Sequence, residues 1–468
     1  DNHISLEGAA DVEFTENVAD RFDAYGWHVV RVPSVNDLDA LDVAVNAAQQ
    51  EGERPSLVIV RSNIGYGSPI QDTAAAHGAP LGEHNVAATR AKLGWTLPPF
   101  AIPGEVYSHW HELVAARAAT HTEWNERYEA YRAAKPELAG ELERVMAGRL
   151  PAAWSGAPSP SFDVGGKVAT RKAGGTVLNA FAEVVPELVG GAADVAPSTD
   201  TQLVNYGDIN AGDWGGRNIH FGVREHAMGA ICNGMAAHGG FRPYCATFFS
   251  FYDYMREDVR LAAIMQIPVV FIFTHDSIAL GEDGPTHQPI EHLAGLRAMP
   301  GVRTMRPADA NETAQAWRAA IEHNGPTVLV LSRQELLTLD PAVLDVAAGA
   351  SVVAPGDSAA IVATGSEVEL ALGARALLAT EGIEARVVSM GCAELFRARP
   401  QAERDQILPP GIPTVAVEAA APTGWHEFAD DVVGLRRYGA SAPGPVVYAK
   451  LGFTPDNVAD HVRKLVKK

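Results

Sequence analysis

The sequence has 468 residues, of which 47% are hydrophobic and 20% charged, a composition that indicates a folded globular protein and excludes a disordered chain. Its 57 acidic and 37 basic residues give a formal net charge of −20, which excludes a nucleic-acid binder that works through a basic surface. Three scattered cysteines suggest neither a disulfide framework nor a zinc site, and the longest apolar runs are too short to cross a bilayer. We therefore expect a cytoplasmic protein with no membrane or nucleic-acid partner.

The first part of the chain, residues 1–150, combines helical patterns with one strand-like run at 56–62. The following stretch, 151–168, is dense in Pro, Gly and Ser, which predicts a linker between domains. In residues 169–340, continuous β-branched runs such as "VVFIFTHDS" and "TVLVLSRQ" alternate with helical stretches such as "NETAQAWRAAIEH". This alternation is typical of a parallel sheet whose strands are buried on both faces under helices.

The last part of the chain, residues 341–468, repeats this style after a second linker-like stretch at 339–358. The run at 359–390 predicts a strand, a turn at Gly365, a helix capped by Ser366, and another strand. The sequence therefore predicts an α/β fold of three domains, each built on a mainly parallel sheet.

One Gly-rich loop of the middle part collects groups that can carry chemistry. "THDSIALGEDGPTHQP" follows a predicted strand and contains His275, Glu282, Asp283 and His287. Open parallel sheets gather their ligands at the carboxyl ends of strands, so this loop is a candidate site. The alternative is a capped turn with solvated charges.

A second candidate lies upstream, where Glu225 precedes a small, apolar, helix-like run in "GVREHAMGAICNGM". A carboxylate in such a run would be buried and would need a partner, unless it is only a first-turn acid at a helix N-terminus. Downstream, Phe248, Phe251 and Tyr254 recur at steps of three. That spacing is typical of a core-facing stripe, although aromatic faces also suit a flat heterocycle.

Several long motifs resemble those of transketolases and follow the family's order: "HGAPLG", "VATRKA", "GVREHAMGAICNGMAAHGG", "FFSFYDYMR", "THDSIALGEDGPTHQPIEHLAGLR" and "ATGSEVELA". The resemblance implies a thiamine diphosphate-binding fold, with an incomplete diphosphate-binding domain at 1–150, a pyrimidine-binding domain at 169–340 and a C-terminal domain at 341–468. It implies two cofactors, thiamine diphosphate and Mg²⁺ or Ca²⁺. The implied reaction, in the pentose phosphate pathway, moves a two-carbon ketol unit from a ketose phosphate such as xylulose 5-phosphate to an aldose phosphate. It also implies a homodimer with shared active sites.

The resemblance assigns cofactor contacts residue by residue. Glu225 resembles the acid that hydrogen-bonds a pyrimidine nitrogen and promotes the imino tautomer. Phe251 resembles the residue that stacks on the pyrimidine ring, with Phe248 and Tyr254 completing the pocket. Asp194, in "AADVAPS", is similar to a family acid near the cofactor.

Substrate contacts follow in the same way. His287 resembles the histidine near the reacting carbons, where an imidazole can take up and release protons, and Asp283 the acid that reads a substrate hydroxyl. His77 resembles a catalytic histidine that touches both cofactor and substrate, and Ile64 an apolar cofactor contact. Four residues match the family's phosphate clamp, in which arginine meets phosphate oxygens two at a time: Arg171, Ser198, His275 and Arg333.

The opening stretch "DNHIS" resembles the end of the Gly-Asp-Gly motif, closed by an Asn, that holds the metal in thiamine diphosphate enzymes. Asn2 would give its amide oxygen and Ile4 its carbonyl oxygen to an octahedral shell. Because the Gly-Asp-Gly half is not in the sequence, we expect the front of this domain to be cleaved, disordered or a separate polypeptide. Three alternatives stay open: dihydroxyacetone synthase, deoxyxylulose-phosphate synthase, and an inactive partner or scaffold subunit.

Overall fold

The computed structural model describes residues 1–467, and Lys468, the last residue of the predicted third domain, lies outside the described residues. The chain divides into two compact units, one of residues 1–128 and one that begins at Glu129. None of the helices in residues 1–467 combines the length and apolar character that crossing a membrane requires.

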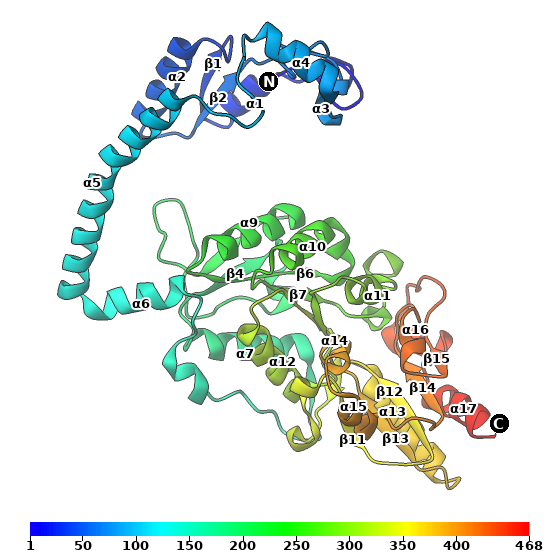
Figure 1. Cartoon of the computed structure of the whole chain (residues 1–468). Coiled ribbons are helices and arrows are strands. Elements are labelled where there is room, and N and C mark those ends of the chain that lie inside the picture. Colours follow the sequence, from blue (N-terminus) through cyan, green and yellow to red (C-terminus); the bar gives the residue numbers. More distant parts are fainter. Residues whose placement is uncertain (468) are drawn as a thin grey trace. The chain divides into compact units, whose positions relative to one another are not determined.

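The first unit, blue to cyan in Figure 1, is built on two parallel strands. β1 (His28–Val32) pairs in register with β2 (Ser56–Val60), and α1 (Val18–Ala24) and α2 (Leu38–Gln50) pack on them. The Asp37 carboxylate caps α2 by accepting a hydrogen bond from the Ala40 amide. The later helices are α3 (Ala75–Gly78), α4 (Gly82–Lys92) and α5 (Gly104–Ala134), the last of which continues into the second unit.

The second unit contains a six-stranded, fully parallel sheet with the order β5-β4-β6-β7-β9-β8. The predicted strands and helix of this region are confirmed as β7, β9 and α12. The strands are β4 (Leu188–Ala192), β5 (Asn218–His220), β6 (Arg242–Phe248), β7 (Val270–Thr274), β8 (Arg303–Met305) and β9 (Thr327–Leu331). Helices cover both faces of this sheet (Figure 1). One face carries α7 (Thr170–Ala182) and α12 (Ala310–Glu322), and the other carries α9 (Glu225–His238) and α10 (Arg256–Met265).

Strand β4 approaches its neighbours too closely for side chains at its centre. A Cβ at Gly190 would lie 2.0 Å from the Tyr244 carbonyl oxygen, and one at Gly191 would lie 1.9 Å from the Ile219 carbonyl oxygen. Glycine is therefore required at both positions, because any Cβ would push β4 away from β5 and β6.

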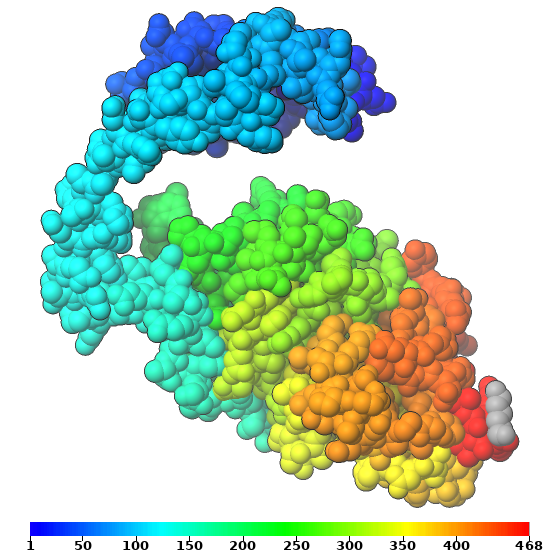
Figure 2. Space-filling model, viewed as in Figure 1, coloured from blue at the N-terminus to red at the C-terminus, as the bar shows by residue number. Residues whose placement is uncertain are grey.

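The C-terminal part carries a five-stranded sheet with the order β11-β13-β12-β14-β15. The predicted strand–turn–helix–strand unit is confirmed as β12 (Ala359–Ala363), α13 (Glu367–Ala379) and β13 (Ala385–Ser389), with β12 and β13 parallel. The rest of the sheet comprises β11 (Ser351–Ala354), β14 (Thr414–Val417) and β15 (Asp431–Val433). Residues 169–340 and 341–467 pack into one body, green to red in Figure 2.

One local prediction about this part was wrong, and another was confirmed only for the position of the residue. The stretch 339–358 is not a plain linker, because its run "SVVA" forms β11, which pairs antiparallel with β13. Ser366 is the N-cap residue of α13, as predicted, but its side chain makes no capping hydrogen bond. Its hydroxyl is instead drawn into hydrogen bonds with the buried Arg306 and Asp276.

Short elements connect these sheets. The stretch 151–168, predicted as a linker, packs against the core, since Trp154 is buried with its ring centroid 4.8 Å from that of Phe181. The remaining strands and helices are β3 (Lys167–Ala169), β10 (Glu335–Leu337), α6 (Pro136–Met146), α8 (Ala196–Thr199), α11 (His292–Arg297), α14 (Ala393–Arg397), α15 (Gln401–Ile407), α16 (Gly444–Lys450) and α17 (Pro455–Val466).

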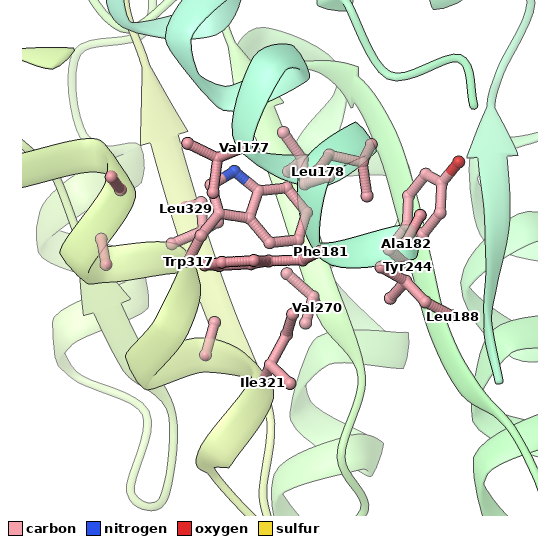
Figure 3. Close-up of a cluster of buried hydrophobic side chains, with 14 of the residues drawn as sticks. Val177, Leu178, Phe181, Ala182, Leu188, Tyr244, Val270, Trp317, Ile321 and Leu329 are labelled. Atoms are coloured by element: carbon pink, nitrogen blue, oxygen red, sulfur yellow. The ribbon is translucent and has the colours of Figure 1, made fainter. Parts of the chain in front are cut away.

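Helices α7 and α12 hold the main sheet through one apolar cluster (Figure 3). Leu178 and Phe181 of α7 and Trp317 of α12 are almost completely buried there. They lie against Val270 and Leu329 of the sheet. Burial of this layer fixes the position of α7 relative to the sheet. The first turn of α7 carries a candidate site residue, Arg171.

Removal of one side chain from this cluster should destabilise the fold. We expect Leu178→Ala to lower the free energy of unfolding by about 2–5 kcal/mol, because the change loses burial and leaves a cavity. Urea titration followed by circular dichroism measures the loss. The matched control Val204→Ala truncates a side chain that is 77% exposed and should change stability by less than about 0.5 kcal/mol. Equal effects of the two substitutions would contradict this account of the core.

Candidate active site

The carboxyl ends of four neighbouring strands carry predicted site residues. Phe248 ends β6, His275 directly follows β7, and Arg333 and Asp194 each stand two residues beyond β9 and β4. Since β4, β6, β7 and β9 are adjacent and parallel, these residues leave the sheet at one edge. This edge of the sheet is therefore a candidate ligand-binding site.

Aromatic and imidazole rings form a wall at this edge. The Phe248 ring centroid lies 4.7 Å from that of His275 and 5.8 Å from that of Phe251. The His287 ring lies 5.3 Å from Phe251, and Tyr254 stands 6.2 Å from Phe251 on the exposed side. The wall joins residues from β6, from the 3₁₀ turn that follows β6 and from the loop after β7.

The aromatic residues at steps of three do not face the core. Residues 249–254 form a 3₁₀ turn, which directs Phe249 and Tyr252 inward, where they are almost fully buried. Phe248 and Phe251 stay half-buried, and Tyr254 is exposed. The stripe therefore presents ring faces that a flat ligand can reach.

Glu225 is the first residue of α9 and is only 9% exposed. Its carboxylate accepts a hydrogen bond of 3.4 Å from the Thr247 hydroxyl, next to Phe248 of the wall. Both interpretations of the sequence hold in part, because this acid lies in the first turn of a helix and is also buried with a partner.

Three basic side chains, which we call the cationic cluster, lie at the same edge: Arg171, His275 and Arg333. The Arg171 guanidinium donates to the Ser198 carbonyl and lies 3.8 Å from the Asp200 carboxylate, while Arg333 donates to the Leu280 carbonyl at 3.0 Å. Burial, together with the charges of Arg171 and Arg333, lowers the pKa of His275 to about 4. Burial also lowers the pKa of Arg171, with Asp200 opposing and Arg333 adding to that effect.

Some polar atoms of the cluster are left without hydrogen bonds. The Nδ1 of His275 and the Nε of Arg171 are buried and have no hydrogen-bond partner among residues 1–467. Buried polar atoms are normally paired, so this edge is suited to a ligand rich in acceptor oxygens.

The loop after β7 brings Asp283 and His287 to this edge. Asp283 is exposed, and its charge raises the pKa of His275, against the larger lowering effect of burial. The loop turns at Gly281 and Gly284, both with positive φ, and the Thr286 hydroxyl lies 3.0 Å from Nδ1 of His287. Asp194 adopts the left-handed conformation, with φ 61°, and is exposed.

The predicted residues of the first unit gather in part at the end of β2. The amino group of Asp1 donates to the Val60 carbonyl at 2.8 Å, so the start of the chain runs beside that strand. The Asn2 amide oxygen accepts from the Ile4 amide at 3.0 Å. Ile64 follows in the loop after β2, and His77 is exposed in α3.

Asn2 and Ile4 offer only neutral oxygens, and the Asn2 amide oxygen already accepts a hydrogen bond. Within residues 1–467, no group of three or more His, Cys, Asp or Glu side chains could hold a metal ion. Mg²⁺ binds chiefly to anionic oxygens, so these two residues do not make a metal site by themselves.

Three residues that contact the site were not predicted from the sequence. Asp200 pairs with Arg171, Thr247 donates to Glu225, and Asp276 follows His275 directly and binds the buried Arg306. Only Asp276 gave a signal, as an acid next to a candidate histidine in "THDS".

Comparison with known families and proteins gives a consistent result. The chain matches "Transketolase, thiamine diphosphate binding domain" over residues 1–151, "Transketolase, pyrimidine binding domain" over 166–338 and "Transketolase-like TK C-terminal domain" over 349–454.

Individual relatives agree with these matches. A transketolase of Geobacillus stearothermophilus is 46% identical over 100% of this chain and 72% of its own length. A chloroplastic transketolase of Arabidopsis thaliana is 42% identical over 98% of this chain and 64% of its own length. A crystal structure of the Pichia stipitis transketolase in complex with sedoheptulose 7-phosphate superposes with a TM-score of 0.95, at 40% identity, over 100% of this chain and 71% of that one.

The depressed pKa of His275 gives a test of the site's electrostatics. The ring should stay neutral until the pH falls to about 4, because burial disfavours its charged form and protonation would also place a third charge beside two arginines. An unfolded chain takes up this proton near pH 6.5, so the contribution of His275 to stability should rise as the pH increases from about 4 to 6.5. NMR titration of the histidine rings measures the pKa of His275, whose resonance is assigned by its absence in His275→Gln. A ring that titrates near pH 6.5 would contradict this assignment.

Proposed function

This chain belongs to the transketolase family, and we propose that the sheet edge of its second unit binds the sugar phosphates of that family's reaction. The reaction is the reversible transfer of a two-carbon ketol unit from a ketose phosphate, such as xylulose 5-phosphate, to an aldose phosphate in the pentose phosphate pathway. The observation that supports the proposal is the cationic cluster, whose buried polar atoms lack hydrogen bonds beside a wall of aromatic rings.

We propose the three domains of the family for this chain. Residues 1–150 belong to the diphosphate-binding domain, 169–340 to the pyrimidine-binding domain and 341–468 to the C-terminal domain, with 151–168 as the connection. The curated relatives named above are transketolases, so we do not favour the dihydroxyacetone or deoxyxylulose-phosphate synthases. The inactive scaffold is not favoured either, because Glu225, His287 and the cationic cluster are all present at one edge. We keep the cytoplasm as the expected location.

The residues present fit thiamine diphosphate at the aromatic wall. A flat aminopyrimidine ring suits the half-buried face of Phe251, between Phe248 and Tyr254, and the buried Glu225 carboxyl offers a hydrogen bond to a ring nitrogen. When bound, this cofactor supplies a carbon nucleophile and an electron sink for C–C bond cleavage. Further cofactor contacts are proposed for Asp194 and, from the first domain, for Ile64, His77, Asn2 and Ile4.

The substrate is held at two ends. We assign its phosphate to the cationic cluster with Ser198, where guanidinium groups and a neutral imidazole can donate hydrogen bonds to phosphate oxygens. We assign its hydroxyls to Asp283, His77 and His287, and His287 also takes up and releases protons near the reacting carbons. Local positive charge at the clamp counters the negative charge of the whole chain.

For a divalent metal, Mg²⁺ or Ca²⁺, we propose only two protein ligands. Asn2 and Ile4 would contribute an amide and a carbonyl oxygen, and the remaining ligands would have to include anionic oxygens from outside this pair, such as those of a diphosphate. No step of the reaction is assigned to the metal.

A homodimer is proposed from an exposed apolar face. On α9 and α10, the large side chains Ile231, Leu261, Ile264 and Met265 are between 39% and 62% exposed, next to the small residues Ala230 and Gly234. The two helices pack against each other and so present one continuous surface, which we call the α9–α10 face. We propose a second copy of the chain as its occupant, with active sites shared between the two subunits.

Glu225 is tested by one substitution. We expect Glu225→Gln to cut turnover at least about a hundredfold and to slow exchange of the thiazolium proton, because the amide cannot share a proton with the ring nitrogen. Substrate binding should change little. Proton exchange followed by NMR and steady-state kinetics measure the two effects. The control Glu183→Gln changes an exposed acid at the end of α7 and should have no effect. Near-normal exchange in Glu225→Gln would remove this role.

The phosphate clamp predicts a difference between donors. We expect Arg171→Ala or Arg333→Ala to raise the KM for xylulose 5-phosphate about ten- to a hundredfold, the loss of one charge-assisted contact worth roughly 1.5–3 kcal/mol. Hydroxypyruvate, which has no phosphate, should be affected much less. Lys172→Ala, which removes an exposed cation beside Arg171 on α7, is the control. Equal losses with both donors would assign these arginines to another task.

The α9–α10 face predicts an oligomeric state. We expect light scattering to give the mass of two chains, and Ile264→Lys to give the mass of one, since it would place a charge on a face that the second copy buries. Leu38→Lys, on an exposed position of α2, serves as the control. A monomer at micromolar concentration without any substitution would contradict the proposal.

A further inference from the structure

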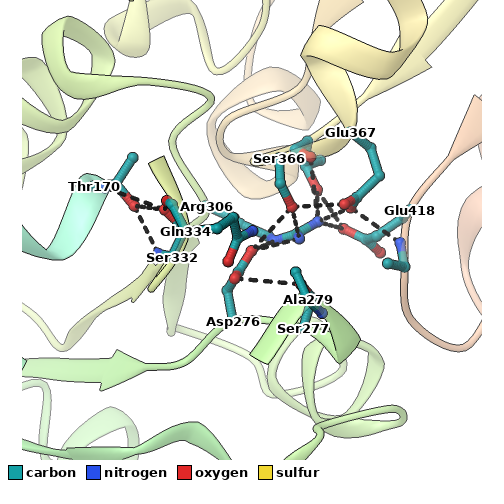
Figure 4. Close-up of polar contacts among 12 residues, drawn as sticks. Thr170, Asp276, Ser277, Ala279, Arg306, Ser332, Gln334, Ser366, Glu367 and Glu418 are labelled. Atoms are coloured by element: carbon teal, nitrogen blue, oxygen red, sulfur yellow. Dashed lines mark hydrogen bonds and ion pairs between the residues drawn. The ribbon is translucent and has the colours of Figure 1, made fainter. Parts of the chain in front are cut away.

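A fully buried arginine joins the two sheets of the second unit (Figure 4). Arg306 stands just beyond β8 and is 1% exposed. Its Nη2 and Nε donate to the Asp276 carboxylate at 2.6 and 3.2 Å. Its other donors reach the turn between β12 and α13: Nη1 donates to the Thr364 hydroxyl at 2.9 Å and to Glu367, and Nη2 to the Ser366 hydroxyl at 3.1 Å.

The partners of Arg306 are themselves fixed. Glu418 is a further partner, whose carboxylate lies 3.8 Å from Nη1 of Arg306. This carboxylate accepts from both Nη atoms of Arg297 at 2.8 Å and from the Trp425 indole at 2.8 Å. Burial alone would raise the pKa of Glu418, but the Arg297 guanidinium, with Arg306, lowers it to about 2. Glu367 accepts from the Tyr448 hydroxyl at 2.6 Å and from the Ala419 amide at 3.0 Å. We call these residues the Arg306 network.

The Arg306 network holds three carboxylates and two guanidinium groups with almost no access to water. Each nitrogen of Arg306 donates to at least one acceptor, so its orientation is fixed by several bonds at once. Displacement of one member would leave a charge buried without its partner, which is strongly unfavourable. The network therefore fixes the position of every residue it contacts.

One of those residues is the direct chain neighbour of the cationic cluster. Asp276 follows His275, and both are almost fully buried. The next residue, Ser277, lies 3.1 Å from the Tyr448 hydroxyl, oxygen to oxygen, so the C-terminal part holds two successive residues after His275. Among the described residues, Nδ1 of His275 has no hydrogen-bond partner, so the ring, which packs against Phe248 at 4.7 Å between centroids, is not oriented by a hydrogen bond at that atom.

We propose that Arg306 is a positioning residue, which acts through Asp276 to aim the His275 imidazole at the phosphate of the substrate, and that Ser366 and Tyr448 extend this task to the C-terminal part. The proposal rests on the proposed function for the identity of the ligand. A neutral imidazole binds a phosphate oxygen only through a directed hydrogen bond, so the affinity for phosphate depends on the orientation of the ring. The arginines of the cluster, which reach the phosphate as long charged side chains, depend less on backbone position.

Two conservative variants test the proposal with the full chain. Ser366→Ala removes the hydroxyl between Arg306 and Asp276, and Tyr448→Phe removes the hydroxyl between Glu367 and Ser277. We expect each to raise the KM for xylulose 5-phosphate about two- to tenfold, the size of one neutral hydrogen bond, with kcat and the KM for hydroxypyruvate unchanged within twofold. Each variant should also shift the His275 ring resonance in the NMR spectrum without substrate.

Trp425→Phe is the matched control, because it removes a hydrogen bond to Glu418, in the same network, and leaves the hydrogen bonds of Asp276 and Ser277 in place. It should lower thermal stability about as much as Ser366→Ala and leave both the KM ratio and the His275 resonance unchanged. The proposal is overturned if Ser366→Ala and Tyr448→Phe behave like Trp425→Phe, or if they impair both donors equally. If the unaltered protein transfers no ketol units, the proposed function fails, and the His275 resonance still decides whether the network positions that ring.

Discussion

Parallel pairing in one register determines where each group of the site can stand. Phe248 pairs with Thr274, and Thr274 with Leu331, so the chain leaves β6, β7 and β9 at the same height. Helix α7 lies over the same sheet and brings Arg171 to that height from its first turn. A shift of one residue in any strand would exchange its two faces and separate His275 from its neighbours. Rings, guanidinium groups and the acid at the start of α9 therefore meet because of the backbone pairing and not because they are close in sequence.

The buried Arg306 and the half-buried Arg171 show how the same type of side chain can serve the fold or a ligand. Each nitrogen of Arg306 donates to protein acceptors, and three carboxylates compensate its charge together with that of Arg297. Arg171 pairs loosely with one carboxylate, its Nε makes no hydrogen bond, and burial lowers its pKa. Burial with complete pairing indicates a structural charge, whereas burial with incomplete pairing leaves binding energy for an anion. In a chain of net charge −20, such incomplete pairing marks the site more clearly than the sum of charges does.

Long, regular patterns made much of the fold predictable. The β-branched runs gave β7 and β9, and the unit of β12, α13 and β13 followed from one strand, turn and helical period. Short elements were missed, because the four residues of β11 carry too little pattern to separate a strand from a linker. Candidate residues next to strands were found, but the partners of Arg306 were not, because Asp276, Glu367 and Glu418 lie 30, 61 and 112 positions away along the chain. Spacing alone also suggested that the aromatic stripe faces the core, because a period of three does not distinguish an α-helix from the 3₁₀ turn that forms.

The glycine pair in β4 restricts how this protein can vary over evolutionary time. At Gly190 and Gly191, every possible amino-acid replacement adds a Cβ that would overlap a carbonyl oxygen of a neighbouring strand. Neither position has a conservative substitute, so both are closed to gradual drift, whereas Leu188 in the same strand can exchange with other apolar residues of similar volume. A change at either glycine would also displace Asp194 and Ser198, which β4 leads to. Mutational tolerance in this strand is therefore decided by the distance between backbones, with Gly191 three residues before Asp194 and seven before Ser198.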